Sequence, residues 1–520
     1  MRAQIGDMAG ADLKDRHGRS PLSYPAEEGH VAVVEILVAR DDVEVNSKDE
    51  DGRSPLSYAV KCGREAVVKL LVGRDGVDVN TKDAYGRSPL SYATENGHEA
   101  VMKLLVRQED IEVNITDAFN RSPLSYAAGN GHEAIVKILM ARDAVNVGST
   151  FCGDDRSPLS YAAQNGQWAV VELLVARGGV KVDSQDDNGR SPLSYAAQQG
   201  HQAVVKILVA RDDVKVNAKD GNGRSPLSYA ASNGHEAVVM LLVERGDVEV
   251  NSKDHYGRSP LSYAAGSGHE AMVKLLVSRH DVEVDSKDDY GLSSLSYAAE
   301  NGHEAVVKIL VARGDVEVNT KDEAGRSSLS YAARYGHEAV VKILAGRDDV
   351  EVNIKDRHGH SPLSYASKYG LVAVVKILVA RDDVEVTIKD RYGHSPLCYA
   401  SRHGHVVVVK ALVAQDDLEL NTKDGDGRSP LSNAARNGHE AVVKILGARD
   451  EVAVNTKDRY GYSPLSYAAE NGHEAVIKIL IARDDVEVNT KDENGCTPLY
   501  HAAKNRHEAV VKILVARDDV

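Results

Sequence analysis

A sequence repeated every 34 residues is the feature that most constrains how this chain can fold. Fifteen copies begin between Ser20 and Thr497, and the copy at Ser463 reads SPLSYAAENGHEAVIKILIARDDVEVNTKD. Only the step from Ser122 to Ser157 is longer, at 35 residues. A fixed period of this length is typical of a solenoid, in which each repeat buries its apolar face only against its neighbours. Such a fold presents an extended surface and no enclosed pocket, so binding is the expected kind of function.

The copy that begins at Ser88 shows how one repeat is expected to fold. Ser88 supplies a helix N-cap and Pro89 suits the first helical position, while Gly97 is expected to end this first helix. A second helix is predicted over residues 98–106, where apolar residues recur at i, i+3 and i+4. The Asp-x-x-Gly-Arg sequence before the next Ser-Pro indicates a short hairpin finger. Since neither helix is long enough to be stable alone, stability must come from stacking.

These residues resemble the ankyrin repeat. Ser-Pro-Leu-Ser-x-Ala matches the T-P-L-H-x-A signature of that family, although its His is Ser in nearly every copy and Cys398 in one. The resemblance covers residues 11–520 and implies an all-α ankyrin-repeat solenoid of fifteen 34-residue helix-turn-helix units with short hairpin fingers. A short N-terminal tail is expected over residues 1–10. Residues 147–156 carry the extra residue and are expected to form an irregular junction within one continuous array.

Charge and cysteine content limit the partners and the compartment. The formal net charge is −15, which argues against nucleic acid and anionic membranes as partners. No apolar run approaches the roughly 18 residues of a membrane span, and the first residues lack the order of a signal peptide. The four cysteines (Cys62, Cys152, Cys398 and Cys496) are too far apart along the array to pair, which favours a reducing compartment. We therefore expect a monomeric cytoplasmic protein, with the nucleus as an open alternative.

Nearly every copy contains a Ser, a His and an Asp, which suggests a hydrolase triad at first sight. Groups that recur a dozen times at one position are better explained as scaffold: a helix cap, the start of the second helix and the start of the finger. The recurring histidines are one repeat apart, too far for shared coordination of a metal at about 2 Å. No phosphate loop occurs. The sequence therefore predicts no catalytic residues, no metal site and no cofactor.

The most distinctive variable positions lie in copies 10 to 12. In ankyrin proteins, partners bind the concave side through the finger tips and the exposed ends of the first helices, and these positions here are basic and aromatic without an Asp or Glu. We call them the basic–aromatic stripe: Arg334, Tyr335, Arg357, His358, His360, Lys368, Tyr369, Arg391, Tyr392, His394, Arg402 and His403. Copy 14 adds Arg459, Tyr460 and Tyr462. Such a surface favours an acidic or phosphorylated ligand. The alternative is chance variation among fifteen solvated tips.

A second candidate surface is the aromatic patch, which consists of Tyr85, Phe119, Phe151 and Trp168. It contains both phenylalanines and the only tryptophan of the chain, and exposed aromatic residues are common binding anchors. The alternative interpretation is that Phe151 and Trp168 fill a gap at the irregular junction.

The sequence thus predicts a non-enzymatic protein–protein interaction scaffold or recognition array that binds a protein partner on its concave face. One alternative comes from the resemblance to the long ankyrin arrays of filamentous fungi, which are often attached to NTPase modules. In that case the chain is the ligand-sensing half of a larger NTPase signalling receptor. A hydrolase is a more distant alternative.

Overall fold

The computed structural model describes residues 13–147 and 156–517, and these residues form helices and turns without a named strand. The chain divides into two compact halves, Met1–His255 and Tyr256–Val520. We call them the N-terminal half and the C-terminal half and describe each by itself. No helix in the described ranges is long and apolar enough to cross a membrane.

Each repeat contributes two helices. In the N-terminal half the first helices are α1 (Ser23–Glu28), α3 (Pro55–Lys61), α5 (Pro89–Asn96), α7 (Pro123–Asn130), α9 (Pro158–Gln164), α11 (Pro192–Gln199) and α13 (Pro226–Asn233). The second helices are α2 (Val31–Val38), α4 (Glu65–Val72), α6 (Glu99–Leu105), α8 (Glu133–Met140), α10 (Trp168–Ala176), α12 (Gln202–Val209) and α14 (Glu236–Val243).

The C-terminal half continues the same alternation. Its first helices are α15 (Pro260–Gly266), α17 (Ser294–Glu300), α19 (Ser328–Tyr335), α21 (Pro362–Tyr369), α23 (Pro396–Arg402), α25 (Pro430–Arg436), α27 (Pro464–Glu470) and α29 (Pro498–Lys504). Its second helices are α16 (Glu270–Val277), α18 (Glu304–Val311), α20 (Glu338–Ala345), α22 (Val372–Val379), α24 (Val406–Leu412), α26 (Glu440–Gly447), α28 (Glu474–Ile481) and α30 (Glu508–Val515).

The helix ends follow from the sequence of the repeat, as α5 shows. The Oγ of Ser88 accepts a hydrogen bond from the N–H of Ser91 at 3.2 Å, and Pro89 occupies the first helical position. Gly97 ends the helix with a φ of 76°, in the left-handed region that glycine adopts without strain. The predicted bounds of the two helices of this repeat are confirmed to within one residue.

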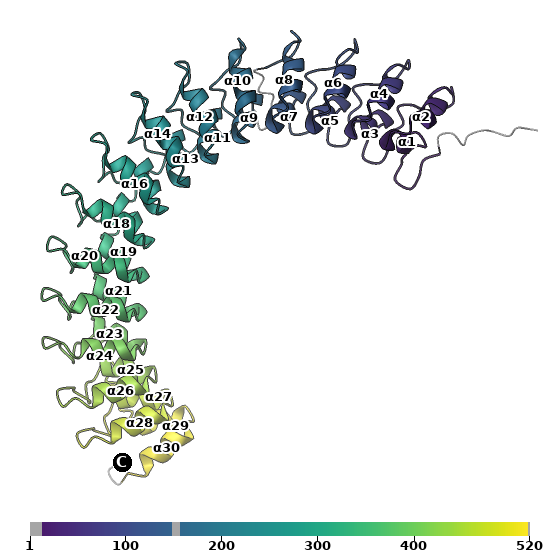
Figure 1. The fold of residues 1–520 in the computed structure, drawn as a ribbon. Coiled ribbons are helices and arrows are strands. Elements are labelled where there is room, and N and C mark those ends of the chain that lie inside the picture. Colours follow the sequence, from purple (N-terminus) through teal and green to yellow (C-terminus); the bar gives the residue numbers. More distant parts are fainter. Residues whose placement is uncertain (1–12, 148–155, 518–520) are drawn as a thin grey trace, which may run out of the picture. The chain divides into compact units, whose positions relative to one another are not determined.

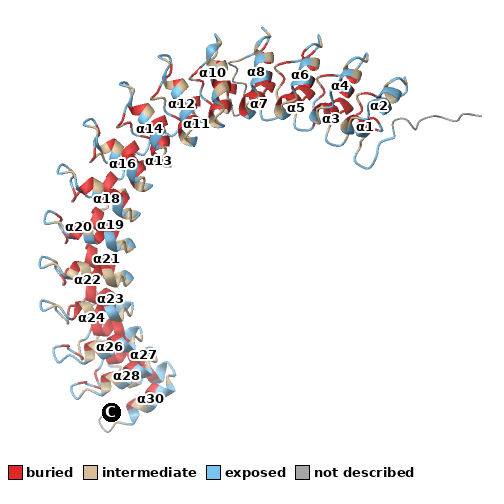
Figure 2. Cartoon of the chain, viewed as in Figure 1, coloured by how far each residue is buried: buried red, intermediate tan, exposed pale blue. Residues whose placement is uncertain are grey.

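Within each half, first helices pack on first helices and second helices on second helices (Figure 1). Figure 2 shows that the buried residues gather on the first helices and on the facing sides of the second helices. In the third repeat, Leu90 of α5 and Leu105 of α6 are completely buried between neighbouring repeats. Burial of one such side chain contributes on the order of 1.5–3 kcal/mol, which is why short helices are stable in the stack.

The predicted finger is a tight turn. In the finger before α5 the N–H of Asp83 donates to the carbonyl of Arg87 at 3.0 Å, and the N–H of Gly86 donates back to Asp83 at 2.9 Å. Gly86 has a φ of 76°, and a Cβ on it would lie 2.8 Å from the backbone nitrogen of Ala118 in the next finger. A residue with a side chain is excluded here, because the positive φ would strain it and its Cβ would clash with the next finger.

The 35-residue step does not interrupt the stacking of helices. Residues 148–155, which include most of the predicted irregular junction and Phe151, lie outside the described residues. On either side of them α7 packs against α9 and α8 packs against α10. The boundary between the two compact halves lies elsewhere, at His255 and Tyr256.

Candidate functional site

The recurring Ser, His and Asp each have a structural partner. Ser88 pairs with Ser91 through their hydroxyls, 3.2 Å apart, at the start of α5. The Nε2–H of His98 donates to the carbonyl of Lys61 in the preceding repeat at 3.0 Å. Asp83 lies in the finger and accepts its hydrogen bonds there. The three residue types therefore bind different partners, in keeping with the scaffold interpretation of the sequence.

A buried hydrogen bond between Tyr and Asp recurs along both halves, and local sequence patterns did not predict it. In the third repeat the hydroxyl of Tyr92 donates to Oδ2 of Asp83 at 2.5 Å. Burial, and then the bond to Asp83, raise the pKa of Tyr92 to about 12. The two residues are nine positions apart, on a helix and on the finger before it, so neither helical nor strand periodicity relates them.

The Arg that follows the finger Gly is also part of this buried arrangement. The guanidinium carbon of Arg190 lies 4.0 Å from the ring centroid of Tyr195 in its own repeat and 4.9 Å from that of Tyr229 in the next repeat. Arg156 and Arg258 are sandwiched between two tyrosine rings in the same way. A cation between two ring faces is an attractive arrangement that links successive repeats.

Most of the basic–aromatic stripe is exposed, at two kinds of place in the C-terminal half. Its fingers carry Arg357 and Arg391, each followed by an exposed aromatic or imidazole side chain. The ends of α19, α21 and α23 carry the other members. Tyr335, Tyr369 and Tyr392 each expose about half of their surface, between 47% and 56%. These rings can therefore be reached by a partner.

Backbone hydrogen bonds hold the fingers of the stripe in register. The N–H of Arg357 donates to the carbonyl of Ala324 in the preceding finger at 2.7 Å, and the N–H of Arg391 donates to the carbonyl of His358 at 2.9 Å. The carbonyl of Tyr392 accepts from Gly425 at 2.6 Å. The exposed side chains are therefore presented from a connected row of turns, which reduces the conformational entropy lost on binding.

The expected exposure of His360 and His394 is wrong. His360 is 8% exposed, with its ring centroid 5.1 Å from that of Tyr365 and 5.7 Å from that of Tyr399. Its Nε2 lies 2.9 Å from the hydroxyl of Tyr399. Burial lowers the pKa of His360 even though Asp356 beside it favours the charged form. Both histidines occupy the position of the sandwiched Arg, which is why they are inside; the side chain of His394 is only 13% exposed.

A pocket of about 510 Å³ lies at the C-terminal end of the stripe and is lined by two of its arginines. Arg391 and Arg402 of the stripe line it together with Arg459, which the sequence assigned to a separate copy. Among the described residues these three side chains make no ion pair with a carboxylate. The one acidic residue in the lining, Asp426, already pairs with Arg428. The pocket is therefore a concentration of uncompensated positive charge on an acidic protein.

A second pocket, of about 310 Å³, lies among the earlier members of the stripe. Arg334, His358, Lys368 and Tyr369 line it, and the carboxylate of Asp356 in its lining is bonded to the buried Tyr365. The two pockets show that the exposed stripe residues lie close enough to act in groups.

The aromatic patch is not a single cluster. Tyr85 and Phe119 lie on adjacent fingers, where the N–H of Ala118 donates to the carbonyl of Tyr85 at 2.8 Å. Trp168 is the first residue of α10, a second helix, and is 54% exposed. Filling of a gap therefore does not explain Trp168. Tyr256 and Tyr290 are also exposed, at the fingers of other repeats, and residue type did not mark them because tyrosine is common in this chain.

Comparison with known proteins places the repeats in a family. The model of ankyrin repeats (3 copies) matches residues 3–83, 75–150, 144–220, 213–288, 295–390, 363–458 and 448–520. Among solved structures, the chain is similar to the ankyrin repeat domain of Bcl-3, a unique member of the IkappaB protein family. The two are 24% identical, with a TM-score of 0.39 over 44% of this chain and 99% of that one. No curated protein matches the sequence.

Proposed function

This chain belongs to the ankyrin-repeat family, and we propose that it is a non-enzymatic scaffold whose stripe binds an acidic or phosphorylated segment of a protein partner. Ankyrin repeats are in general modules for protein–protein interaction, and the recurring polar residues of this chain hold its repeats together. The specific function must therefore lie in side chains that differ between repeats and reach the surface.

The observation that carries the proposal is the pocket formed by Arg391, Arg402 and Arg459. Arginine stays charged at all physiological pH values and can form paired hydrogen bonds with a carboxylate or a phosphate. Because these three side chains have no carboxylate partner in the described chain, a ligand with negative charge gains attraction without breaking an existing ion pair.

The exposed rings beside the arginines supply the apolar part of the surface. Tyr335 and Tyr369 stand at the ends of α19 and α21, and Tyr392 stands on a finger. Tyrosine is enriched among residues that dominate binding energy because it buries a large area at a small entropy cost. A segment that combines acidic or phosphorylated residues with apolar ones matches this mixture of charge and aromatic surface.

The proposal is tested by reversing the charge of three exposed arginines, Arg357, Arg391 and Arg402, to Glu. The full chain and this variant are used to capture proteins from a lysate, and the captured proteins are compared. We expect specific partners to be lost from the variant, because glutamates repel an acidic ligand. Phosphatase treatment of the lysate distinguishes phosphorylated from acidic ligands, since only the former are then lost.

The matched control changes Lys342, Lys376 and Lys410 to Glu. These exposed lysines lie on second helices of the same three repeats, so the control alters the net charge by the same amount on a different face. We expect this control to keep the partners of the parent. Identical capture by the parent and the arginine variant would contradict the proposal, as would equal losses from both variants.

The compartment and the larger context are also proposals. Cys62, Cys398 and Cys496 are free thiols, which supports a cytoplasmic location, and we propose a monomer. The alternative role as the sensing part of an NTPase receptor uses the same surface; co-purification with an NTPase would favour it.

A further inference from the structure

The finger before α29 departs from the repeat at two positions at once. Cys496 stands where most copies have the sandwiched Arg, and His501 stands where nearly all copies have the buried Tyr. The Asp of the finger, Asp492, is unchanged. Cysteine, histidine and aspartate are all ligands of transition-metal ions. No other copy has a Cys or a His at both of these positions.

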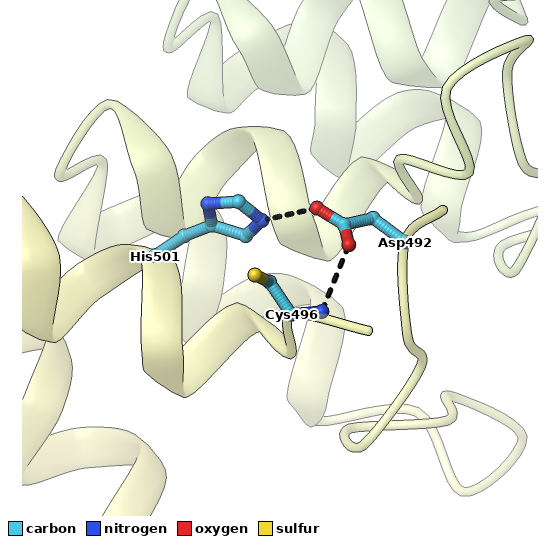
Figure 3. A group of neighbouring side chains, drawn as sticks. All are labelled: Asp492, Cys496 and His501. Atoms are coloured by element: carbon cyan, nitrogen blue, oxygen red, sulfur yellow. Dashed lines mark hydrogen bonds and ion pairs between the residues drawn. The ribbon is translucent and has the colours of Figure 1, made fainter. Parts of the chain in front are cut away.

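The structure brings the three side chains together (Figure 3). One carboxylate oxygen of Asp492, the sulfur of Cys496 and one ring nitrogen of His501 all lie within 4.8 Å of one another. The Nε2–H of His501 donates to Oδ2 of Asp492 at 2.9 Å, and the backbone N–H of Cys496 donates to the other oxygen at 2.8 Å. The ligands thus come from a single repeat, D-x3-C-x4-H, and not from the row of histidines one repeat apart.

The site is shielded but reachable. The side chain of His501 is 6% exposed and that of Asp492 is buried, whereas Cys496 is partly exposed. The ring of Tyr462 covers His501, with a distance of 4.8 Å between the ring centroids. An ion can therefore approach from the side of the sulfur, and it is enclosed by a ring and a buried carboxylate on the other side.

We propose that Asp492, Cys496 and His501 form a binding site for one zinc ion. A thiolate, an imidazole and a carboxylate are the borderline-soft and hard donors that Zn²⁺ accepts together, at about 2.0–2.3 Å. In a tetrahedral site with these bond lengths, ligand atoms are roughly 3.3–3.8 Å apart. The sulfur needs to approach the other two atoms by at most about 1.5 Å, whereas Nε2 of His501 and Oδ2 of Asp492, now 2.9 Å apart, need to separate by about 0.4 Å; a fourth position is left for water.

Binding changes one hydrogen bond. When both atoms bind the ion, the proton that Nε2 of His501 now donates to Asp492 must move to Nδ1 of the neutral ring, and the thiol of Cys496 must lose its proton to solvent. Zinc binding therefore releases the thiol proton. The simpler interpretation is that the bond from His501 to Asp492 only replaces the Tyr–Asp bond of the other repeats, and the experiment separates the two.

The test uses the reduced full chain, freed of metal, and titrates it with Co²⁺ as a spectroscopic probe for Zn²⁺. We expect one equivalent to produce a sulfur-to-cobalt charge-transfer band and tetrahedral visible bands, and Zn²⁺ to displace it. Cys496→Ser is expected to abolish the charge-transfer band and to weaken Zn²⁺ binding at least about 100-fold, since even loss of an outer-shell partner costs up to that much. Cys398→Ser, at a buried thiol in another repeat, is the control and should keep the band.

A second variant guards against misfolding. Cys496→Arg combined with His501→Tyr restores the two residues that the other repeats use, so its helices should form while Zn²⁺ binding is lost. A parent chain without the charge-transfer band, or a band that survives in Cys496→Ser, would overturn the proposal. Zn²⁺ binding of parental strength in the restored double variant would do the same.

Discussion

The buried hydrogen bond between Tyr and Asp is predicted to be a principal link between the finger and the first helix of a repeat. Tyr92 and Asp83 form this bond in the third repeat. The substitution Tyr92→Phe removes the hydroxyl and keeps the ring, so the stacking of Arg87 on this ring, at 4.7 Å, is retained. The change removes the hydrogen bond to Asp83 together with a longer one, in which Nε of Arg53 donates to the hydroxyl of Tyr92 at 3.4 Å.

The size of the effect follows from the donors that remain. Asp83 accepts four hydrogen bonds: from the hydroxyl of Tyr92 at 2.5 Å, from Nε of Arg87 at 3.1 Å, and from the backbone N–H groups of Tyr85 and Arg87 at 2.9 and 2.8 Å. A hydrogen bond to a charged group contributes about 1.5–3 kcal/mol. Because three donors still satisfy the carboxylate, we expect a loss of about 2 kcal/mol, toward the lower part of this range.

Hydrogen exchange is the appropriate assay, because a repeat array does not unfold in two states and a single melting temperature is therefore hard to interpret. A loss of about 2 kcal/mol corresponds to an approximately 30-fold faster exchange of the amides in the finger and α5. Since each repeat contacts only its neighbours, the effect should fade beyond α3 and α7.

The control is Tyr85→Phe, on the same finger, where the ring is 51% exposed. It should leave exchange unchanged to within about twofold, which is the effect of a surface substitution. The reasoning is refuted if Tyr92→Phe exchanges like the parent, or if the two substitutions accelerate exchange equally.

Four further outcomes are expected. Since the pKa of Tyr92 is raised from 10 to about 12 in the folded chain, the stability that this residue supplies is complete below pH 10 and is lost as the pH rises from 10 to 12, as circular dichroism should show. Ser294→Pro and Ser328→Pro restore the usual first helical residue and should each stabilise the chain by less than about 0.5–1 kcal/mol in denaturant titrations, because the buried hydroxyl contacts with Ser262 and Ser296 are lost. Pro25→Ala should move the start of α1 towards that of the other first helices and slow hydrogen exchange there, because proline lacks the N–H that would bond one turn back. Partner binding should weaken with salt, because salt screens the charges of the stripe. In the same binding assay, His403 should contribute to affinity only below pH 6.5, because burial and nearby cations lower its pKa.

The sequence predicted the parts of the fold that depend on neighbours along the chain. The cap at Ser88 and the left-handed Gly97 each lie within four residues of their partners, and both are present. The start of α1 follows the same local logic: this helix begins at Ser23, two residues later in its repeat than the other first helices, and Pro25 in its first turn lacks an N–H.

The sequence did not predict contacts between residues about one repeat apart. Arg190 touches a tyrosine of the next repeat, 39 residues away, and His360 occupies the same place between Tyr365 and Tyr399. Read as a surface position, His360 seemed part of the binding stripe. No hydrophobic period marks an Arg or a His as buried when aromatic faces and a carboxylate surround it, so only the packed structure could correct this assignment.

The natural variation at the buried Tyr position shows which property the repeat requires. In one copy the residue is Asn433, whose Nδ2 donates to Asp424 at 3.2 Å, and in another it is His501, whose Nε2 donates to Asp492 at 2.9 Å. A donor to the finger carboxylate is retained in both. This requirement leaves the residue after the finger Gly free to change, since that position is Tyr462 or Cys496 in different copies. The array can therefore acquire a new surface at this position through single substitutions that leave the hydrogen bond of the finger intact.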